Sequence, residues 1–100
     1  MAIRLNLNNQ EFQRQWFALE KQGRIAVLNC CAKVAGMEWN EIYRGQGLRW
    51  EVVQSRTSPE RERERVYSIR VTQKVRAVVR RVGDFLEFLT LHTDHDSAHR

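Results

Sequence analysis

The sequence has 100 residues, of which 42% are hydrophobic and 9% aromatic, and it carries a formal net charge of +5. This length corresponds to a single domain over residues 1–100 with one hydrophobic core. No apolar run approaches the ~20 residues of a membrane span, and residues 1–7 are too short and polar for a signal peptide, so we expect a cytoplasmic protein. The positive charge favours an acidic partner, either a nucleic acid or an acidic protein.

The first part of the chain predicts a strand and a helical hairpin. Residues 2–7 alternate apolar and polar side chains, as a half-buried strand does. Asn8 and Asn9 then offer a cap for a helix that Gly23 interrupts. The apolar residues of this helix, at helical spacing, are Phe12, Trp16 and Leu19. Two helices joined in this way can cover one face of a sheet.

The second helix is expected from about Arg24 to Ala35, with Gly36 as its stop. Cys30 and Cys31 fall within it, and we expect them to be reduced thiols near the core. Because the sequence holds no second pair of cysteines, a cysteine-based zinc site is not supported. The helix stripe that faces the core is expected to consist of Ile25, Leu28, Ala32 and Ala35.

The second part of the chain predicts an antiparallel meander. Residues 39–43 suggest a short helical turn and residues 48–54 a strand, whereas residues 60–65 alternate Glu and Arg as a solvated segment does. A hairpin over residues 67–79 and a last strand over residues 85–91 follow. This order indicates an α+β fold, in which an N-terminal strand and an αα-hairpin pack on one face of an antiparallel β-meander.

The predicted hairpin places two arginines opposite each other. If residues 72–74 form its loop, Val71 faces Val75 and Arg70 faces Arg76. Like charges in opposite positions destabilise a sheet unless an anion lies between them, and Arg suits phosphate because it is bidentate and always charged. The pattern therefore suggests a phosphodiester bound over the sheet. Alternatively, both arginines pair with carboxylates, for which the candidates are Glu51, Glu62 and Glu64.

The turn before the last strand decides which residue faces Arg76. The apolar pattern favours a three-residue turn over residues 83–85, which places Arg76 opposite His92 on the open face of the sheet. A two-residue turn over residues 83–84 is the commoner type, but it would shift the pairing by one residue and separate the two. In the favoured register Val79 pairs with Leu89 and Ala77 with Leu91. The residues that face the helices are then Val71, Val75, Ala77, Val79, Leu89 and Leu91.

Two arginines and a histidine on one face are enough to cleave RNA through attack by the 2′-hydroxyl. The reaction needs a base for the 2′ proton, stabilisation of the phosphorane charge, and an acid for the leaving 5′-oxygen. Arginine suits the second task, and histidine near neutral pH suits the first or the third, so no metal or cofactor is expected. The alternative is a metal cluster formed by His92, Asp94, His95 and Asp96.

The run from Tyr67 to Val78 resembles the central hairpin of the RelE/HigB/YoeB toxins, in which an aromatic-Ser-x-Arg strand is followed, six residues after its Arg, by a second Arg. This resemblance implies that Arg76 is the main catalytic arginine and Arg70 its phosphate-binding companion. It also implies an acid/base histidine at the end of the last strand, for which the candidates are His92 and His95. The lysine-rich strand of some members is absent, and the expected RNA-binding substitutes are Arg49, Arg56, Lys74 and Arg80.

The resemblance further implies the toxin of a toxin–antitoxin system. Such a protein is an endoribonuclease that cleaves messenger RNA, usually on the ribosome, and an acidic antitoxin holds it inactive. Homo-oligomers are then expected only through the antitoxin complex, and no membrane association is expected. The same superfold includes gyrase inhibitors of the ParE type. A non-catalytic gyrase inhibitor and a basic nucleic-acid-binding interaction protein are therefore the alternatives.

Overall fold

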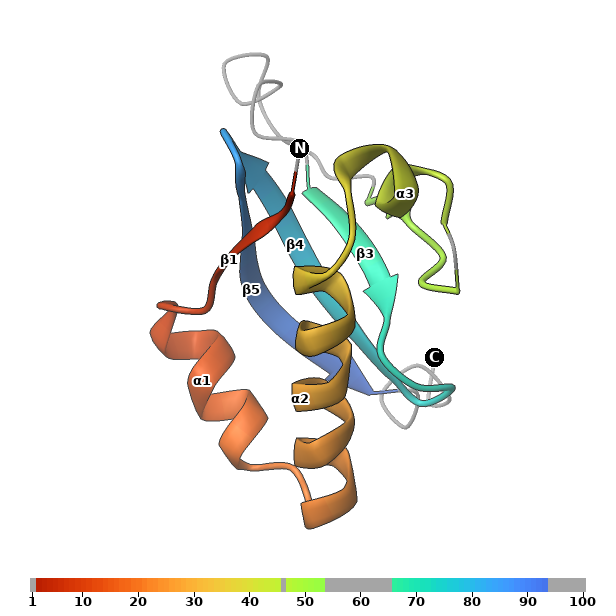
Figure 1. Cartoon of the computed structure of the whole chain (residues 1–100). Helices are drawn as coiled ribbons and strands as arrows, with labels where there is room; N and C mark the ends of the chain where they lie inside the picture. The colour runs from red at the N-terminus through yellow and green to blue at the C-terminus, as the bar shows by residue number, and fades with distance from the viewer. Residues whose placement is uncertain (1, 46, 54–65, 94–100) are drawn as a thin grey trace.

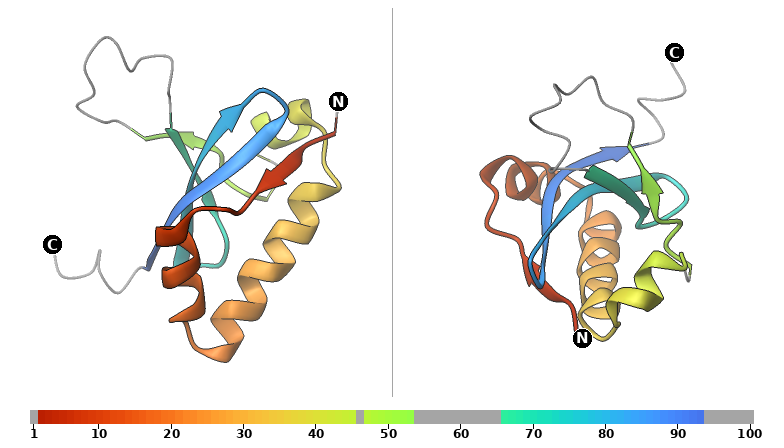
Figure 2. Two further views of the ribbon diagram at one scale, coloured as in Figure 1. Left: turned by 90° about the vertical axis from the view of Figure 1, so that its left-hand side faces the viewer. Right: turned by 90° about the horizontal axis from the view of Figure 1, so that it is seen from above.

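The computed structural model describes residues 2–45, 47–53 and 66–93. Their strands form one sheet of order β1-β5-β4-β3-β2, in which β1 runs parallel to β5 and the other neighbours are antiparallel. Helices α1 and α2 cover one face of this sheet (Figures 1 and 2), so the predicted α+β architecture is confirmed. The elements are β1 (Arg4–Asn6), α1 (Gln10–Phe17), α2 (Lys21–Ala35), α3 (Trp39–Tyr43), β2 (Glu51–Val52), β3 (Val66–Arg70), β4 (Val75–Val82) and β5 (Phe85–Thr93).

Helix α1 begins as the sequence predicts. The side chain of Asn9 caps it by accepting a hydrogen bond of 2.9 Å from the backbone N–H of Phe12. Phe12 is fully buried, and its ring lies 5.3 Å from that of Phe88, which fixes α1 against β5. Gly23 does not end a helix but lies inside the first turn of α2, where a Cβ would come within 3.2 Å of Leu19. The glycine thus allows the turn between the helices to pack closely.

Helix α2 buries a different face from the predicted one. Ile25 and Leu28 are 46% and 55% exposed, and Ala32 and Ala35 are also exposed. The buried residues of α2 are instead Val27, Cys30, Cys31 and Val34. This stripe and the predicted one are both apolar and both at helical spacing, so periodicity alone could not decide between them.

No helix in the described segments is long and apolar enough to cross a membrane.

Burial of the two cysteines changes their acidity. Desolvation raises the pKa of Cys30 to about 11, although the nearby Lys33 opposes the rise. Desolvation raises the pKa of Cys31 to about 12, and the neighbouring Cys30 adds to the rise. Both are free cysteines in the core, as the sequence suggested, and both remain protonated at neutral pH.

The hairpin of β3 and β4 has the predicted register. Arg70 pairs with Arg76, and the backbone N–H of Val71 donates to the carbonyl of Val75 at 2.9 Å. The hydroxyl of Thr72 accepts hydrogen bonds of 3.0 Å from the backbone N–H groups of Lys74 and Val75. The threonine side chain therefore closes the loop and fixes which residues lie opposite each other.

The connection from β4 to β5 differs from the prediction. Val82 pairs with Phe85, so the turn has two residues, and its glycine, Gly83, has a φ of +62°. The register then shifts on β5, where Leu89 is left without a partner as a β-bulge. The turn has one residue fewer than predicted, and the bulge on β5 contains one extra residue. The two differences cancel, so Arg76 still pairs with His92, as predicted.

The bulge also changes which residues of β5 enter the core. Val79 pairs with Phe88 instead of Leu89, whereas Ala77 pairs with Leu91 as expected. Leu86, Phe88 and Leu91 are buried, and Leu89 is only half-buried. The prediction that Leu89 faces the helices is therefore wrong, because alternation along a strand breaks at a bulge.

Candidate functional site

The open face of the sheet brings together three of the predicted site residues. Arg70 on β3, Arg76 on β4 and His92 on β5 are consecutive partners across the three strands, and we call them the Arg76 row. Their strand neighbours Ile69, Ala77 and Leu91 are buried. Since side chains alternate between faces, the Arg76 row belongs by its position to the face turned away from the helices, but Arg70, at the end of β3, also lines a hollow with Asn29 and Lys33 of α2.

The two arginines of this row have no acidic partner in the part of the chain that the structure describes. Arg76 is exposed and Arg70 is half-buried. Glu51 pairs with Ser68 in the sheet, but within the described segments no carboxylate forms an ion pair with Arg70 or Arg76. The alternative partners Glu62 and Glu64 lie outside the described residues. Two guanidinium groups in adjacent strand positions provide a binding site for an anion.

His92 is oriented by a residue that sequence reasoning missed. The hydroxyl oxygen of Thr90 lies 2.9 Å from Nε2 of His92, and the two residues share the open face because they are two positions apart. Within the described part of the chain, Nδ1 of His92 has no hydrogen-bond partner. The only signal in the sequence is the Thr-x-His spacing on a strand.

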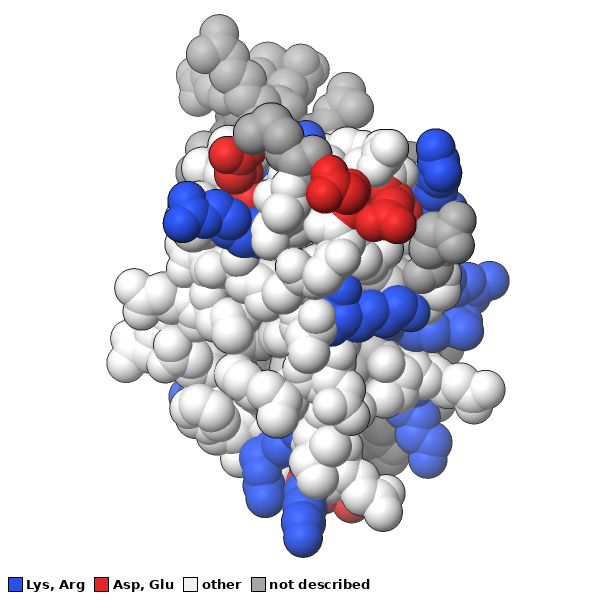
Figure 3. All heavy atoms as spheres, viewed as in Figure 1, with Lys and Arg blue, Asp and Glu red and all other residues white. Residues whose placement is uncertain are grey.

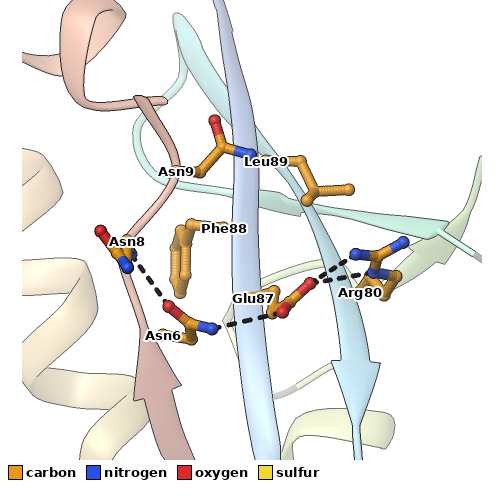
Figure 4. Close-up of a pocket in the computed structure, with 7 residues that line it drawn as sticks. All are labelled: Asn6, Asn8, Asn9, Arg80, Glu87, Phe88 and Leu89. Carbon is orange, nitrogen blue, oxygen red and sulfur yellow. Dashed lines mark hydrogen bonds and ion pairs between the residues drawn. The ribbon is translucent and has the colours of Figure 1, made fainter. Parts of the chain in front are cut away.

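Arg80 lies on the same face but is already paired. Its Nε and Nη2 donate to Oε1 of Glu87 at 3.0 and 2.7 Å, while Nδ2 of Asn6 donates to Oε2 of the same carboxylate at 3.2 Å. Figure 4 shows these three side chains in one line across β1, β5 and β4. The pairing favours a structural role for Arg80, which joins three strands, and its contact with RNA stays a prediction.

A small hollow of about 150 Å³ lies beside this line of side chains (Figure 4). Asparagines at the end of β1 and just after it form one wall, and the bulged Leu89 forms part of the other. Asn6 accepts a hydrogen bond of 2.9 Å from the backbone N–H of Asn8, so this wall is held in place. The complete lining is Asn6, Asn8, Asn9, Arg80, Glu87, Phe88 and Leu89.

The remaining predicted RNA-binding residues lie around the Arg76 row rather than in it. Lys74 is exposed in the loop between β3 and β4, two positions before Arg76. Arg49 is exposed in the segment before β2 and has a φ of +52°, the left-handed region that is uncommon for residues with a Cβ. Arg56 and His95 lie outside the described residues.

The predicted metal cluster falls mostly outside the structure. Asp94, His95 and Asp96 are not among the described residues, whereas His92 is. The residues that are described contain no group of three or more His, Cys, Asp or Glu side chains that could hold a metal ion.

Comparisons with known proteins support the fold. No family model matches the sequence, and no curated protein matches it. Among solved structures, the chain is similar to a copper-bound mutant toxin from Helicobacter pylori, with a TM-score of 0.51 and 14% sequence identity. The match covers 94% of this chain and 97% of that chain. At this level of identity, the likeness shows that the two chains share a fold over nearly their whole length.

Proposed function

We propose that this protein is the toxin of a toxin–antitoxin system and acts as an endoribonuclease on messenger RNA. The observation that supports the proposal is the Arg76 row, which places an oriented histidine and two arginines, without an ion pair among the described residues, in consecutive strands. The fold shared with a toxin agrees with this role. We further propose that the protein acts in the cytoplasm, on ribosome-bound message, and inhibits translation.

The dimensions of the Arg76 row suit a phosphodiester. Neighbouring strands lie about 4.8 Å apart, so the row spans about 10 Å, which accommodates one phosphate with its ribose. Arg70 and Arg76 can hold two phosphate oxygens, and the phosphorane carries more negative charge than the substrate. Their attraction is therefore strongest in the transition state, which is the condition for catalysis.

His92 supplies the proton transfer in this proposal. The 2′-hydroxyl attacks phosphorus, the bond to the 5′-oxygen breaks, and the products are a 2′,3′-cyclic phosphate and a 5′-hydroxyl. One proton leaves the 2′-oxygen and one is added to the 5′-oxygen, and His92 can perform either transfer. Its contact with Thr90 holds the ring on the face where the phosphate binds. None of these steps requires a metal ion, so cleavage should persist in EDTA.

The exposed arginines also favour an acidic partner. A net charge of +5 and a sheet face that carries Arg70 and Arg76 attract an acidic chain over long range. We therefore propose an acidic antitoxin that covers the Arg76 row and inhibits the enzyme by occupying the phosphate site.

The test is single-turnover cleavage of ribosome-bound message. Arg76→Ala should lower the rate by about 10²–10³, because a group that stabilises transition-state charge is lost. Arg44→Ala is the matched control, since Arg44 is an exposed arginine at the end of α3. This variant should cleave at the wild-type rate. If Arg76→Ala cleaves as fast as wild type, the site is wrong. If wild type arrests growth without cleaving RNA, a gyrase inhibitor becomes the better explanation.

A further inference from the structure

The helical hairpin has an apolar surface on its outer side. Phe17 at the end of α1 is 61% exposed and stacks on Trp16 with ring centroids 5.3 Å apart, while Ile25 and Leu28 of α2 are about half exposed. Figure 3 shows the region of α1 and α2 as largely uncharged, with basic residues at its lower edge. A hollow of about 400 Å³, which we call the hairpin pocket, is lined by Trp16, Phe17, Lys21, Arg24, Ile25 and Leu28.

The hairpin pocket is preformed by hydrogen bonds between its two sides. The indole N–H of Trp16 donates to the carbonyl of Arg24 at 3.1 Å, and Nη1 of Arg24 donates to the carbonyl of Leu19 at 2.6 Å. These bonds tie the end of α1 to the first turns of α2. A partner therefore finds the apolar side chains already in position, which lowers the entropic cost of binding.

The residues of this sequence that the structure does not describe lack the apolar side chains needed to cover the hairpin pocket. The residues that the structure does not describe contain one large apolar side chain, that of Met1, and are otherwise polar, charged or small. Contiguous exposed apolar surface on a small protein usually marks an interaction site. The occupant is therefore expected to be another molecule.

The charges around the pocket favour an acidic occupant. Lys21 and Arg24 line it, no acidic residue does, and within the described segments neither cation forms an ion pair with a carboxylate. A second copy of this chain would bring the same cations together in a protein of net charge +5, which is unfavourable.

We propose that the hairpin pocket binds an amphipathic helix of an acidic partner protein. Apolar side chains on one face of that helix would pack between Phe17 and Leu28, and its carboxylates would lie near Lys21 and Arg24. The residues that line the pocket belong to α1 and α2. These helices cover the face of the sheet opposite to the one to which alternation assigns the Arg76 row (Figures 1 and 2). A partner bound there leaves the proposed RNA-binding face uncovered, so this interaction goes beyond inhibition of cleavage.

The test uses two synthetic amphipathic peptides of about five helical turns. Both carry Leu on one face, and the other positions are Glu-rich in the probe and Lys-rich in the control. We expect the Glu peptide alone to bind and to shift the amide resonances of α1 and α2. Ile25→Ser with Leu28→Ser should weaken binding about tenfold or more, because apolar contact area is lost. Val52→Ser, which changes an equally exposed apolar residue on β2, should have no effect.

Other outcomes contradict the proposal in distinct ways. Equal binding of both peptides, or shifts confined to the sheet face, would exclude a charge-selective hairpin site. If the wild type forms dimers that the double substitution dissociates, the pocket binds a second copy of this chain. If the wild type binds anionic vesicles and the double substitution abolishes that binding, the pocket binds a lipid surface. RNA cleavage by the double variant should equal that of wild type, so failure of this proposal can be told apart from failure of the proposed function.

Discussion

The hydroxyl oxygen of Thr90 lies 2.9 Å from Nε2 of His92 on the open face of the sheet. Both side chains belong to β5 just beyond the bulge at Leu89, and His92 pairs with Arg76 across the ladder. The bulge, the threonine and the arginine together determine where the imidazole lies on this face. If His92 transfers the proton as proposed, a residue that only orients it should have a smaller effect on the cleavage rate than His92 itself.

Thr90→Val tests this relationship. The substitution keeps the shape of the side chain but removes the hydroxyl, so the ring of His92 loses its partner. One hydrogen bond contributes about 1 kcal/mol, so we expect single-turnover cleavage to fall about fivefold. His92→Gln should cost more, about 10²-fold or beyond, because the proton-transfer group is removed. Wild-type cleavage by Thr90→Val, with His92→Gln inactive, would show that the histidine needs no orienting partner.

The paired carboxylate of Glu87 should stabilise the fold. Glu87 and Arg80 have side chains only 23% and 31% exposed, and Asn6 shares the carboxylate. Glu87→Ala should lower the free energy of unfolding by about 1–3 kcal/mol, since partly buried donors lose their acceptor. Arg14→Ala, which breaks an exposed ion pair with Glu11, should cost at most about 1 kcal/mol. Urea denaturation measures both. Equal losses would mean that the line across β1, β5 and β4 contributes no more than a surface pair.

Deletion of Leu89 should leave the sheet register unchanged. Phe88 pairs with Val79 and Thr90 with Val78, so removing the unpaired residue joins two pairs that already exist. We expect a folded protein in which cross-strand NMR contacts between Arg76 and His92 persist. Deletion of Val78 is the control, because it moves the following side chains of β4 to the wrong face and should prevent folding. Unfolding of the Leu89 deletion would show that the bulge itself, through its twist, is required.

The buried thiols predict a fall in stability at alkaline pH. Burial raises the pKa of Cys30 to about 11 and that of Cys31 to about 12, above their ordinary value of 9.0. Between about pH 9 and pH 11 the unfolded chain releases thiol protons that the folded chain keeps. The unfolded state then binds fewer protons, so the free energy of unfolding is undiminished by these thiols below pH 9 and decreases as the pH rises.

Urea midpoints measured at several pH values from neutrality to about pH 11 check this prediction. The matched variant is Cys30→Val with Cys31→Val, which keeps apolar side chains of similar size and removes both ionisable groups. Its stability should decline less steeply than that of wild type above pH 9. Identical pH profiles would show that the thiols do not contribute.

The sequence predicts the central hairpin correctly because the apolar alternation of β3 and that of β4 agree on one register, which places Arg70 opposite Arg76. In α2 the signals do not agree, since the helix is apolar on two faces and only packing against the sheet decides which is buried. The second apolar face, with Ile25 and Leu28, is the one that forms the hairpin pocket.

The pairing of β5 shows a different limit of sequence reasoning. Apolar alternation correctly places Arg76 opposite His92, but it assigns the extra residue to the turn instead of the strand. A three-residue turn without a bulge and a two-residue turn with a bulge give the same pairing from Thr90 onward. Apolar alternation therefore cannot distinguish the two arrangements. The contact of Arg80 with Glu87 depends on the pairing between the turn and the bulge, so apolar alternation could not predict it.

The position of β5 between β1 and β4 affects the order in which the sheet can assemble during synthesis of the chain. Asn6 and Glu87 are in contact across 81 positions of sequence, and β1 has no strand partner until β5 has been synthesised. Contacts this distant in sequence form late and slowly. A nascent chain that has not reached β5 lacks Leu86 and Phe88 for its core and His92 for its proposed chemistry. The fold therefore delays assembly of the face that carries the Arg76 row until β5 has been synthesised.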